Sequence, residues 1–176
     1  MLFRSTIYTY IFRGLPLLLV LLLVGFGVPG LQLSWLPNSA VLLGTVSLIL
    51  TYSAYVAEVI RAGIEAVHPT QRMAARALGL SSAKTQRHVV LPQAFRKVLP
   101  PLLNDLVSLQ KDSGLISVLG AIDAIRAAGI ETAQSFNFTP YLVAGFFFVL
   151  LTIPLTRYTD WLTKRQDLAR QQQGQW

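Results

Sequence analysis

The sequence has 176 residues, of which 53% are hydrophobic and 13% charged, and its formal net charge is +7. Leu, Val and Phe occur in blocks rather than in alternation, a pattern that is typical of lipid-facing helices and unusual for a soluble domain. The absence of cysteine excludes disulfides and thiolate metal sites, and the two histidines lack the acidic neighbours of a metal site.

The basic residues are distributed asymmetrically along the chain. They precede the first hydrophobic run (Arg4, Arg13), crowd one long polar loop (Arg61, Arg72, Arg76, Lys84, Arg87, Arg96, Lys97) and follow the last run (Arg157, Lys164, Arg165, Arg170). The connection over residues 29–39 carries no charge. This positive-inside pattern predicts that both termini and the long loop are cytoplasmic, and it accounts for the net charge without a nucleic-acid partner.

The first predicted span covers residues 15–36, after a cytoplasmic lead-in over residues 1–14. Its apolar run, 15–28, is short for a crossing, and extension toward Leu36 reaches the roughly 20 residues that a crossing needs. Taken alone, this run with Arg13 before it also fits a secretory signal peptide. The spans that follow favour a membrane helix.

The second predicted span, residues 39–57, mixes Leu and Val with small and hydroxyl residues, which are Gly44, Thr45, Ser47, Thr51 and Ser53. Such residues let helices approach closely in lipid, so we expect this span to pack inside a bundle. Where it enters the cytoplasm, Glu58 and Arg61 stand three residues apart and are expected to form a surface ion pair, which contributes little to stability.

A basic elbow, residues 70–92, occupies the centre of the cytoplasmic loop 58–97. Pro69 disfavours α geometry at the residue before it and is therefore expected to interrupt the incoming helix. Thr70 is predicted to be the N-cap of a short helix.

This short helix is predicted over Gln71–Leu78, with Gly79 as its C-terminal stop. Ser81 or Ser82 then caps a second short helix, which we expect Pro92 to end. The elbow is thus predicted to be two helices joined by a tight turn.

The third predicted span, residues 99–120, has apolar ends and a polar middle. At about 100° per residue, its polar residues share one face, and these are Asn104, Asp105, Ser108, Lys111 and Asp112. Ionisable groups at membrane depth are costly unless they are paired or hydrated, so this face is expected to look into the bundle or a cavity. Either aspartate could neutralise Lys111.

Residues 121–138 are predicted to be an outer, partly helical segment, and residues 139–156 a fourth span that contains Pro154. The tail over 165–176 is polar, and we expect it to be frayed. The predicted fold is therefore an all-α membrane bundle of about four spans in one domain, residues 1–176. The phosphate-loop, nucleophile-elbow and H-E-x-x-H motifs are absent, so nothing indicates catalysis or ATP binding in this chain.

The elbow resembles a known signature. The elbow contains Met73-Ala74-Ala75, then Gly79 after three intervening residues, then Val89-Val90-Leu91-Pro92 after nine more, and this spacing is similar to E-A-A-x3-G-x9-I-x-L-P. That signature belongs to the permease subunits of binding-protein-dependent ABC importers.

Flanking segments narrow the resemblance to the polar amino-acid family of these permeases, and together they cover nearly the whole chain. These segments are FRGLP (12–16), AYVAEVIRAG (54–63), LPQAFRKVLPPLLND (91–105) and KDSGLISVLG (111–120).

The resemblance implies that the elbow is the coupling helix, which sits in a groove of a separate ATP-hydrolysing subunit. The implied docking residues are Thr70, Met73, Ala74, Ala75, Arg76, Gly79, Leu91 and Pro92. The partner ATPase would use ATP and Mg, and this chain would hold no cofactor. A second permease subunit, identical or a sister chain, and an extracytoplasmic solute-binding protein would complete the importer in the bacterial cytoplasmic (inner) membrane.

The polar face of the third span then has two possible roles. A polar or charged amino acid passing through the bilayer needs counter-charges, which this face offers as a substrate pathway. Alternatively, its residues pair with one another and with neighbouring helices to hold the bundle together.

Two departures from the family pattern stand out. Family members have a further membrane helix upstream of the FRGLP segment, which only 11 residues precede here, so we expect a truncated gene model or an unusual subunit. Met73 replaces the signature Glu. With Thr70 as the N-cap, residue 73 is the N3 position, and Met there forfeits a capping-box bond of about 0.5–1 kcal/mol.

Two other functions compete with a transporter. The elbow also resembles a helix-turn-helix motif. If the chain were a membrane-tethered DNA-binding protein, Arg72, Lys84 and Arg87 would contact DNA phosphates. Such a domain needs a third helix and a core of its own, for which the loop has little room. An ATP-independent, channel-like bundle is the other alternative, and it gives no reason for an ordered elbow.

Overall fold

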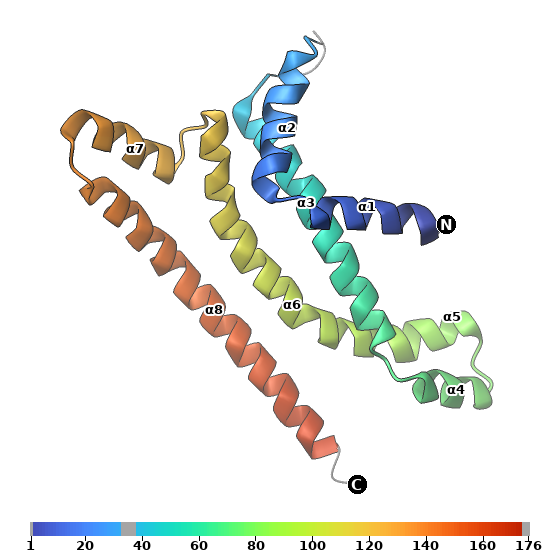
Figure 1. The fold of residues 1–176 in the computed structure, drawn as a ribbon. Coiled ribbons are helices and arrows are strands. Elements are labelled where there is room, and N and C mark those ends of the chain that lie inside the picture. The colour runs from blue at the N-terminus through green and yellow to red at the C-terminus, as the bar shows by residue number, and fades with distance from the viewer. Residues whose placement is uncertain (1, 33–37, 174–176) are drawn as a thin grey trace. The chain divides into compact units, whose positions relative to one another are not determined.

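The computed structural model describes residues 2–32 and 38–173, and this part of the chain is helical and contains no strand (Figure 1). The predicted all-α fold is confirmed. The elements are α1 Leu2–Gly14, α2 Leu17–Gly30, α3 Ala40–Glu65, α4 Pro69–Ala77, α5 Ser82–Thr85, the π-helix η1 Gln86–Val90, α6 Leu91–Asp112, the 3-10 helix η2 Ser113–Leu119, α7 Ala124–Ser135 and α8 Thr139–Gln173.

Two helical segments in the described part are long and apolar enough to cross a membrane, Ala40–Glu65 and Thr139–Arg165. Two bent pairs pass the same test only when each is taken as one broken span. The helices of one pair, Ile7–Gly14 and Leu17–Gly30, meet at 98°, and those of the other, Ser82–Leu119 and Ala124–Ser135, meet at 50°. The chain therefore offers two to four crossings, and four is the number that the hydrophobic runs predict.

The predicted first span corresponds to α2, a helix of 14 residues. Pro16 stands just before it with ψ at 134°, outside the helical range, and this separates α2 from the α1 lead-in. At 1.5 Å per residue α2 is about 20 Å long, shorter than the hydrocarbon core. Residues 31 and 32 form a turn after α2, and the rest of the expected extension toward Leu36, residues 33–37, lies outside the described part.

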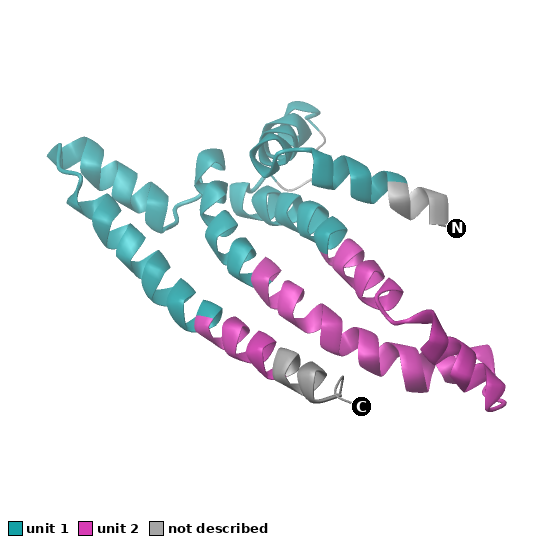
Figure 2. Cartoon of the chain, turned by 60° about the horizontal axis from the view of Figure 1, so that its bottom comes forward, with its two compact units in different colours: residues 1–55, 106–156 teal, residues 56–105, 157–176 magenta. Residues whose placement is uncertain are grey.

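The chain divides into two compact units, and the first comprises residues 1–55 and 106–156 (teal in Figure 2). Within it η2 packs closely on two helices at glycines. A Cβ on Gly25 would lie 2.3 Å from the Leu119 side chain, and one on Gly44 would lie 2.6 Å from Ile116. Ser47 and Thr51 of α3 are also buried. The prediction that this span packs inside a bundle is confirmed.

The second unit comprises residues 56–105 and 157–176 (magenta in Figure 2), and its core lies where α3 ends and α6 begins. Val67, Val90 and Ala94 are buried together, with Ile64 packed against them. The expected pair between Glu58 and Arg61 is present, with 2.5 Å between the carboxylate and the guanidinium.

Pro92 does not end the second helix of the elbow, which corrects the sequence prediction. The chain stays helical from Ser82 through η1 into α6, and Pro92 is the second residue of α6. The Leu91 N–H donates to the Gln86 carbonyl, five residues back, as in a π-helix. A proline inside an α-helix collides with the carbonyl four residues earlier, and the wider π turn just before Pro92 gives the ring room.

The segment predicted to be partly helical over 121–138 contains α7, as expected. The last helix, α8, passes Pro154 and continues through the polar tail to Gln173, further than the expected span end at residue 156. The final residues, 174–176, lie outside the described part.

The close approach of α3 and α6 at Gly63 gives a testable prediction. A Cβ there would lie 2.0 Å from Cγ2 of Val98, a stiff β-branched side chain. We expect Gly63→Ala to lower the stability of the detergent-solubilised protein by about 1–3 kcal/mol, measured by thermal unfolding. Adding Val98→Ala should recover part of the loss. Gly27→Ala is the control, because a Cβ on that helical glycine meets nothing within 4 Å. Equal stability of the Gly63→Ala and Gly27→Ala proteins would contradict this packing.

Candidate functional site

The elbow begins where α3 stops, and its first helix is capped by His68. The Nδ1 atom of His68 accepts the Thr70 N–H at 3.3 Å, and Pro69 is the first residue of α4. The predicted N-cap, Thr70, is therefore wrong by two positions. Met73 becomes the fifth helical residue rather than the third, so the capping-box explanation for the missing Glu does not apply.

Two cationic side chains bind the carbonyls at the end of α3. The Arg72 Nη2 donates to the Ile64 carbonyl at 2.8 Å, and the Lys97 Nζ donates to the Ala66 carbonyl. The last carbonyls of a helix lack partners within it and carry partial negative charge, so both contacts are favourable. Because Arg72 belongs to α4, the first helix of the elbow, and Lys97 to α6, into which the elbow continues, both helices are tied to the end of α3.

Gly79 ends α4 in the manner predicted for it. Its φ is +82°, the left-handed region that only glycine adopts readily. The Leu80 N–H donates to the Ala75 carbonyl and the Gly79 N–H to the Arg76 carbonyl, which together form a Schellman motif. The backbone N–H groups of Gly79 and Leu80 are thus both hydrogen-bonded within the elbow.

The second half of the elbow starts at Ser81, whose Oγ accepts the Lys84 N–H at 3.4 Å. Arg76 bridges the turn by donating to the Leu80 carbonyl at 3.3 Å and to Ser82 Oγ at 3.1 Å. The predicted arrangement of helix, tight turn and helix is confirmed, with Ser81 as the cap (Figure 1).

Seven of the eight predicted docking residues are exposed, which are Thr70, Met73, Ala74, Arg76, Gly79, Leu91 and Pro92. Ala75 is the exception, since it is 5% exposed and packs inside the elbow. Its small size therefore serves the folding of the elbow rather than contact with another molecule.

Sequence reasoning missed Leu78, the most prominent apolar side chain of the elbow. It is 83% exposed although it stands between the helix and its glycine stop. With Met73, which is 61% exposed, it gives α4 an apolar outer surface. A leucine in an amphipathic pattern is ordinarily assigned to the core, so the sequence alone gave no signal for this exposure.

The five residues predicted for the substrate pathway all lie on the continuous helix α6. Asn104, Ser108 and Lys111 are exposed, and Asp105 and Asp112 are partly buried. The carboxylate of Asp112 accepts a hydrogen bond from the Tyr52 hydroxyl at 2.8 Å, a contact from α3 that sequence reasoning also missed. Because the two residues stand 60 positions apart, no local pattern could have paired them.

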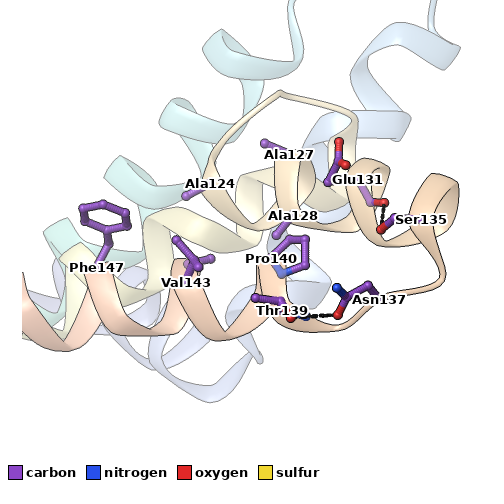
Figure 3. A pocket seen from close by; sticks show the side chains of 11 residues that line it. Ala124, Ala127, Ala128, Glu131, Ser135, Asn137, Thr139, Pro140, Val143 and Phe147 are labelled. Atoms are coloured by element: carbon purple, nitrogen blue, oxygen red, sulfur yellow. Dashed lines mark hydrogen bonds between the residues drawn. The ribbon is translucent and has the colours of Figure 1, made fainter.

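A separate cleft of about 700 Å³ lies between α7 and α8 (Figure 3). Alanines of α7 form one wall, and Val143 and Phe147 of α8 contribute to the other. Glu131 is the charged residue of the lining, and its backbone carbonyl accepts the Ser135 hydroxyl at 2.8 Å. None of the predicted docking or pathway residues lines this cleft.

Known proteins are similar to this chain in sequence and in fold. The family described as "Binding-protein-dependent transport system inner membrane component" matches residues 4–168. The arginine transport system permease protein ArtQ of Bacillus subtilis (strain 168) is 39% identical over 150 residues, which cover 85% of this chain and 68% of that protein. The probable glutamine ABC transporter permease protein GlnM of the same bacterium is 36% identical over 166 residues, covering 93% and 74%.

A solved structure described as "Crystal structure of an amino acid ABC transporter with histidines" is similar with a TM-score of 0.83 and 36% sequence identity. The match covers 91% of this chain and 74% of that chain.

The contacts of Arg72 and Lys97 with the end of α3 can be tested by removing both side chains. Each bond should contribute about 1 kcal/mol, so Arg72→Gln combined with Lys97→Gln should speed hydrogen exchange over residues 66–85 by about 5- to 30-fold, as measured by mass spectrometry. Arg87→Gln removes an equivalent charge from an exposed position of η1 and should leave exchange unchanged. Unchanged exchange in the double variant would show that these bonds do not hold the elbow.

Proposed function

The chain belongs to the family of inner-membrane components of binding-protein-dependent transport systems, and we propose that it is the permease subunit of an ATP-driven amino-acid importer. The expected family is confirmed by the match over residues 4–168. The proposed substrate class rests on the similar proteins, which are described as transporters of arginine, glutamine or amino acids.

The observation that carries the coupling proposal is an exposed elbow fastened to two long helices. Its apolar outer surface, with Met73, Ala74 and Leu78, suits a groove on a separate ATPase subunit. Its inner side is fixed through Arg72, Lys97 and the Val67 core. A force applied to the outer surface would therefore reach α3 and α6 together rather than bend a loose loop.

The proposed cycle follows from this attachment. ATP and Mg bind to the partner ATPases, whose closure moves the elbows of two permease subunits and rocks the attached helices, so that a central site opens alternately to each side. An extracytoplasmic binding protein delivers the amino acid. In this proposal the chain is not an enzyme, it lies in the bacterial cytoplasmic membrane, and both of its termini are cytoplasmic.

The polar face of α6 is the proposed substrate path. Asp112 is held by Tyr52 at the boundary between buried and exposed surface, and Asp105 stands two turns earlier on the same helix. A carboxylate that is fixed in position can select the amino group of a substrate, because buried polar groups discriminate strongly between ligands.

The Gly79 turn gives the test of coupling. Gly79→Asp places a side chain at φ +82° and adds a negative charge at the negative end of α4, so the tip of the elbow should distort. We expect the protein to remain in the membrane while transport-coupled ATP hydrolysis and uptake are abolished, both measured in proteoliposomes with the ATPase and the binding protein.

Ala83→Asp is the matched control for this test. It adds the same charge at an exposed residue near the N-terminus of α5, where negative charge is favourable, and it should retain uptake. Full uptake by the Gly79→Asp protein would count heavily against docking through the elbow.

The two aspartates test the substrate path. Asp105→Asn or Asp112→Asn should raise KM or alter the selection among polar amino acids by about tenfold or more, measured as uptake kinetics. Tyr52→Phe should reproduce part of the Asp112→Asn effect, and the double variant should show less than the sum, because both changes remove one hydrogen bond. Unaltered kinetics for every polar amino acid in both Asp variants would assign the face a purely structural role.

A further inference from the structure

An apolar groove of about 660 Å³ lies between the end of α3 and the first half of α6. Ile60 and Ile64 line it from α3, and Leu91, Phe95 and Leu102 line it from α6. Ile60, Leu91 and Phe95 remain 43%, 46% and 64% exposed, so the groove is open along one side. A large apolar surface left open in this way indicates a binding site for an apolar partner.

One charged residue, Arg96, contributes to the lining of this groove. The cations around it are engaged, since Arg61 pairs with Glu58 while Arg72 and Lys97 bind the carbonyls at the end of α3. Arg96 is exposed and forms no ion pair or hydrogen bond within the described part of the chain. The groove therefore combines an apolar trough with a free guanidinium, which suits a ligand with an apolar body and an anionic head.

The groove lies on the side of α6 opposite Asn104, Ser108 and Lys111, while Asp105 and Asp112 lie about a quarter turn from it. Asn104 follows Phe95 by nine residues, which at about 100° per residue places the two side chains on opposite faces. If the polar face looks into the bundle, Phe95 and the groove look outward. In a membrane protein of this family the outward side of a helix meets lipid.

We propose that this groove seats an anionic phospholipid, with an acyl chain between Ile60 and Phe95 and the phosphate on Arg96. Basic pockets between membrane helices at the cytoplasmic side bind anionic headgroups, and an apolar trough adds the burial of methylenes. The proposal depends on membrane residence and not on the substrate class. Leu91 and Pro92 line the groove and are also predicted docking residues, so the lipid test instead changes Arg96 and Ile60, which are not.

Native mass spectrometry of the full chain tests the site. The protein is extracted from vesicles with equal amounts of phosphatidylglycerol and phosphatidylcholine, and the retained lipid is counted. We expect phosphatidylglycerol to be retained preferentially, and Arg96→Gln to lower its retention about fivefold. Arg96→Lys keeps the charge and should keep most of the binding.

Two further variants separate the headgroup from the groove. Arg87→Gln removes an exposed charge outside the groove and should behave like the parent protein. Ile60→Trp fills the groove and should lower the retention of both lipids. Equal retention of the two lipids, unaffected by Arg96→Gln and Ile60→Trp, would overturn the proposal.

The competing occupant is a helix of a second copy of this chain. Since the sequence has no cysteine, Phe95→Cys creates a single reporter, and Phe146→Cys is a matched control because Phe146 is 63% exposed. The proposal predicts no excess disulfide-linked dimer from position 95 when membranes are oxidised before extraction. Efficient dimer formation from position 95 and not from 146 would show that a second chain covers the groove, and would also overturn the proposal.

Discussion

The carbonyls at the end of α3 impose the constraint on which the elbow depends. A helix that stops beside a polar loop needs partners for its last carbonyls, and here Arg72 and Lys97 supply them from the two sides of the elbow. Beneath these bonds Val67, Val90 and Ala94 are buried together. The same contacts that satisfy a helix end thus help to hold the connection over residues 66–90, which contains α4, α5 and η1, as a structured element.

Sequence patterns predicted the features that depend on local chemistry. A helix stop at Gly79 is predictable because the left-handed conformation favours glycine, and the Glu58 and Arg61 pair is predictable from its spacing. A cap at Ser81 or Ser82 is predictable from the hydroxyl groups, and the structure shows that the cap is Ser81. Features that depend on competition between local preferences were predicted wrongly. His68 rather than Thr70 caps α4. A π turn just before Pro92 lets the helix continue through this proline, which would break an ideal α-helix.

Features that depend on long-range packing could not be predicted. The burial of Ala75, the exposure of Leu78 and the bond from Tyr52 to Asp112 follow from which face of each helix meets which neighbour. Composition indicates that a polar residue inside a span needs a partner, but it does not name the partner. The apolar outer surface of the elbow, with Met73, Ala74 and Leu78, is therefore exposed, whereas Ala75 of the signature is buried.

We propose that the apolar outer surface of the elbow, with Met73, Ala74 and Leu78, contacts a separate ATPase subunit. Labelling of a Leu78→Cys protein with a membrane-impermeant maleimide tests it most directly, because this would be the single cysteine of a chain that has none. In inside-out vesicles the cysteine should react rapidly when the chain is alone and should be protected when the ATPase is co-expressed. Equal labelling with and without the ATPase, or labelling only from the outer side, would contradict the account.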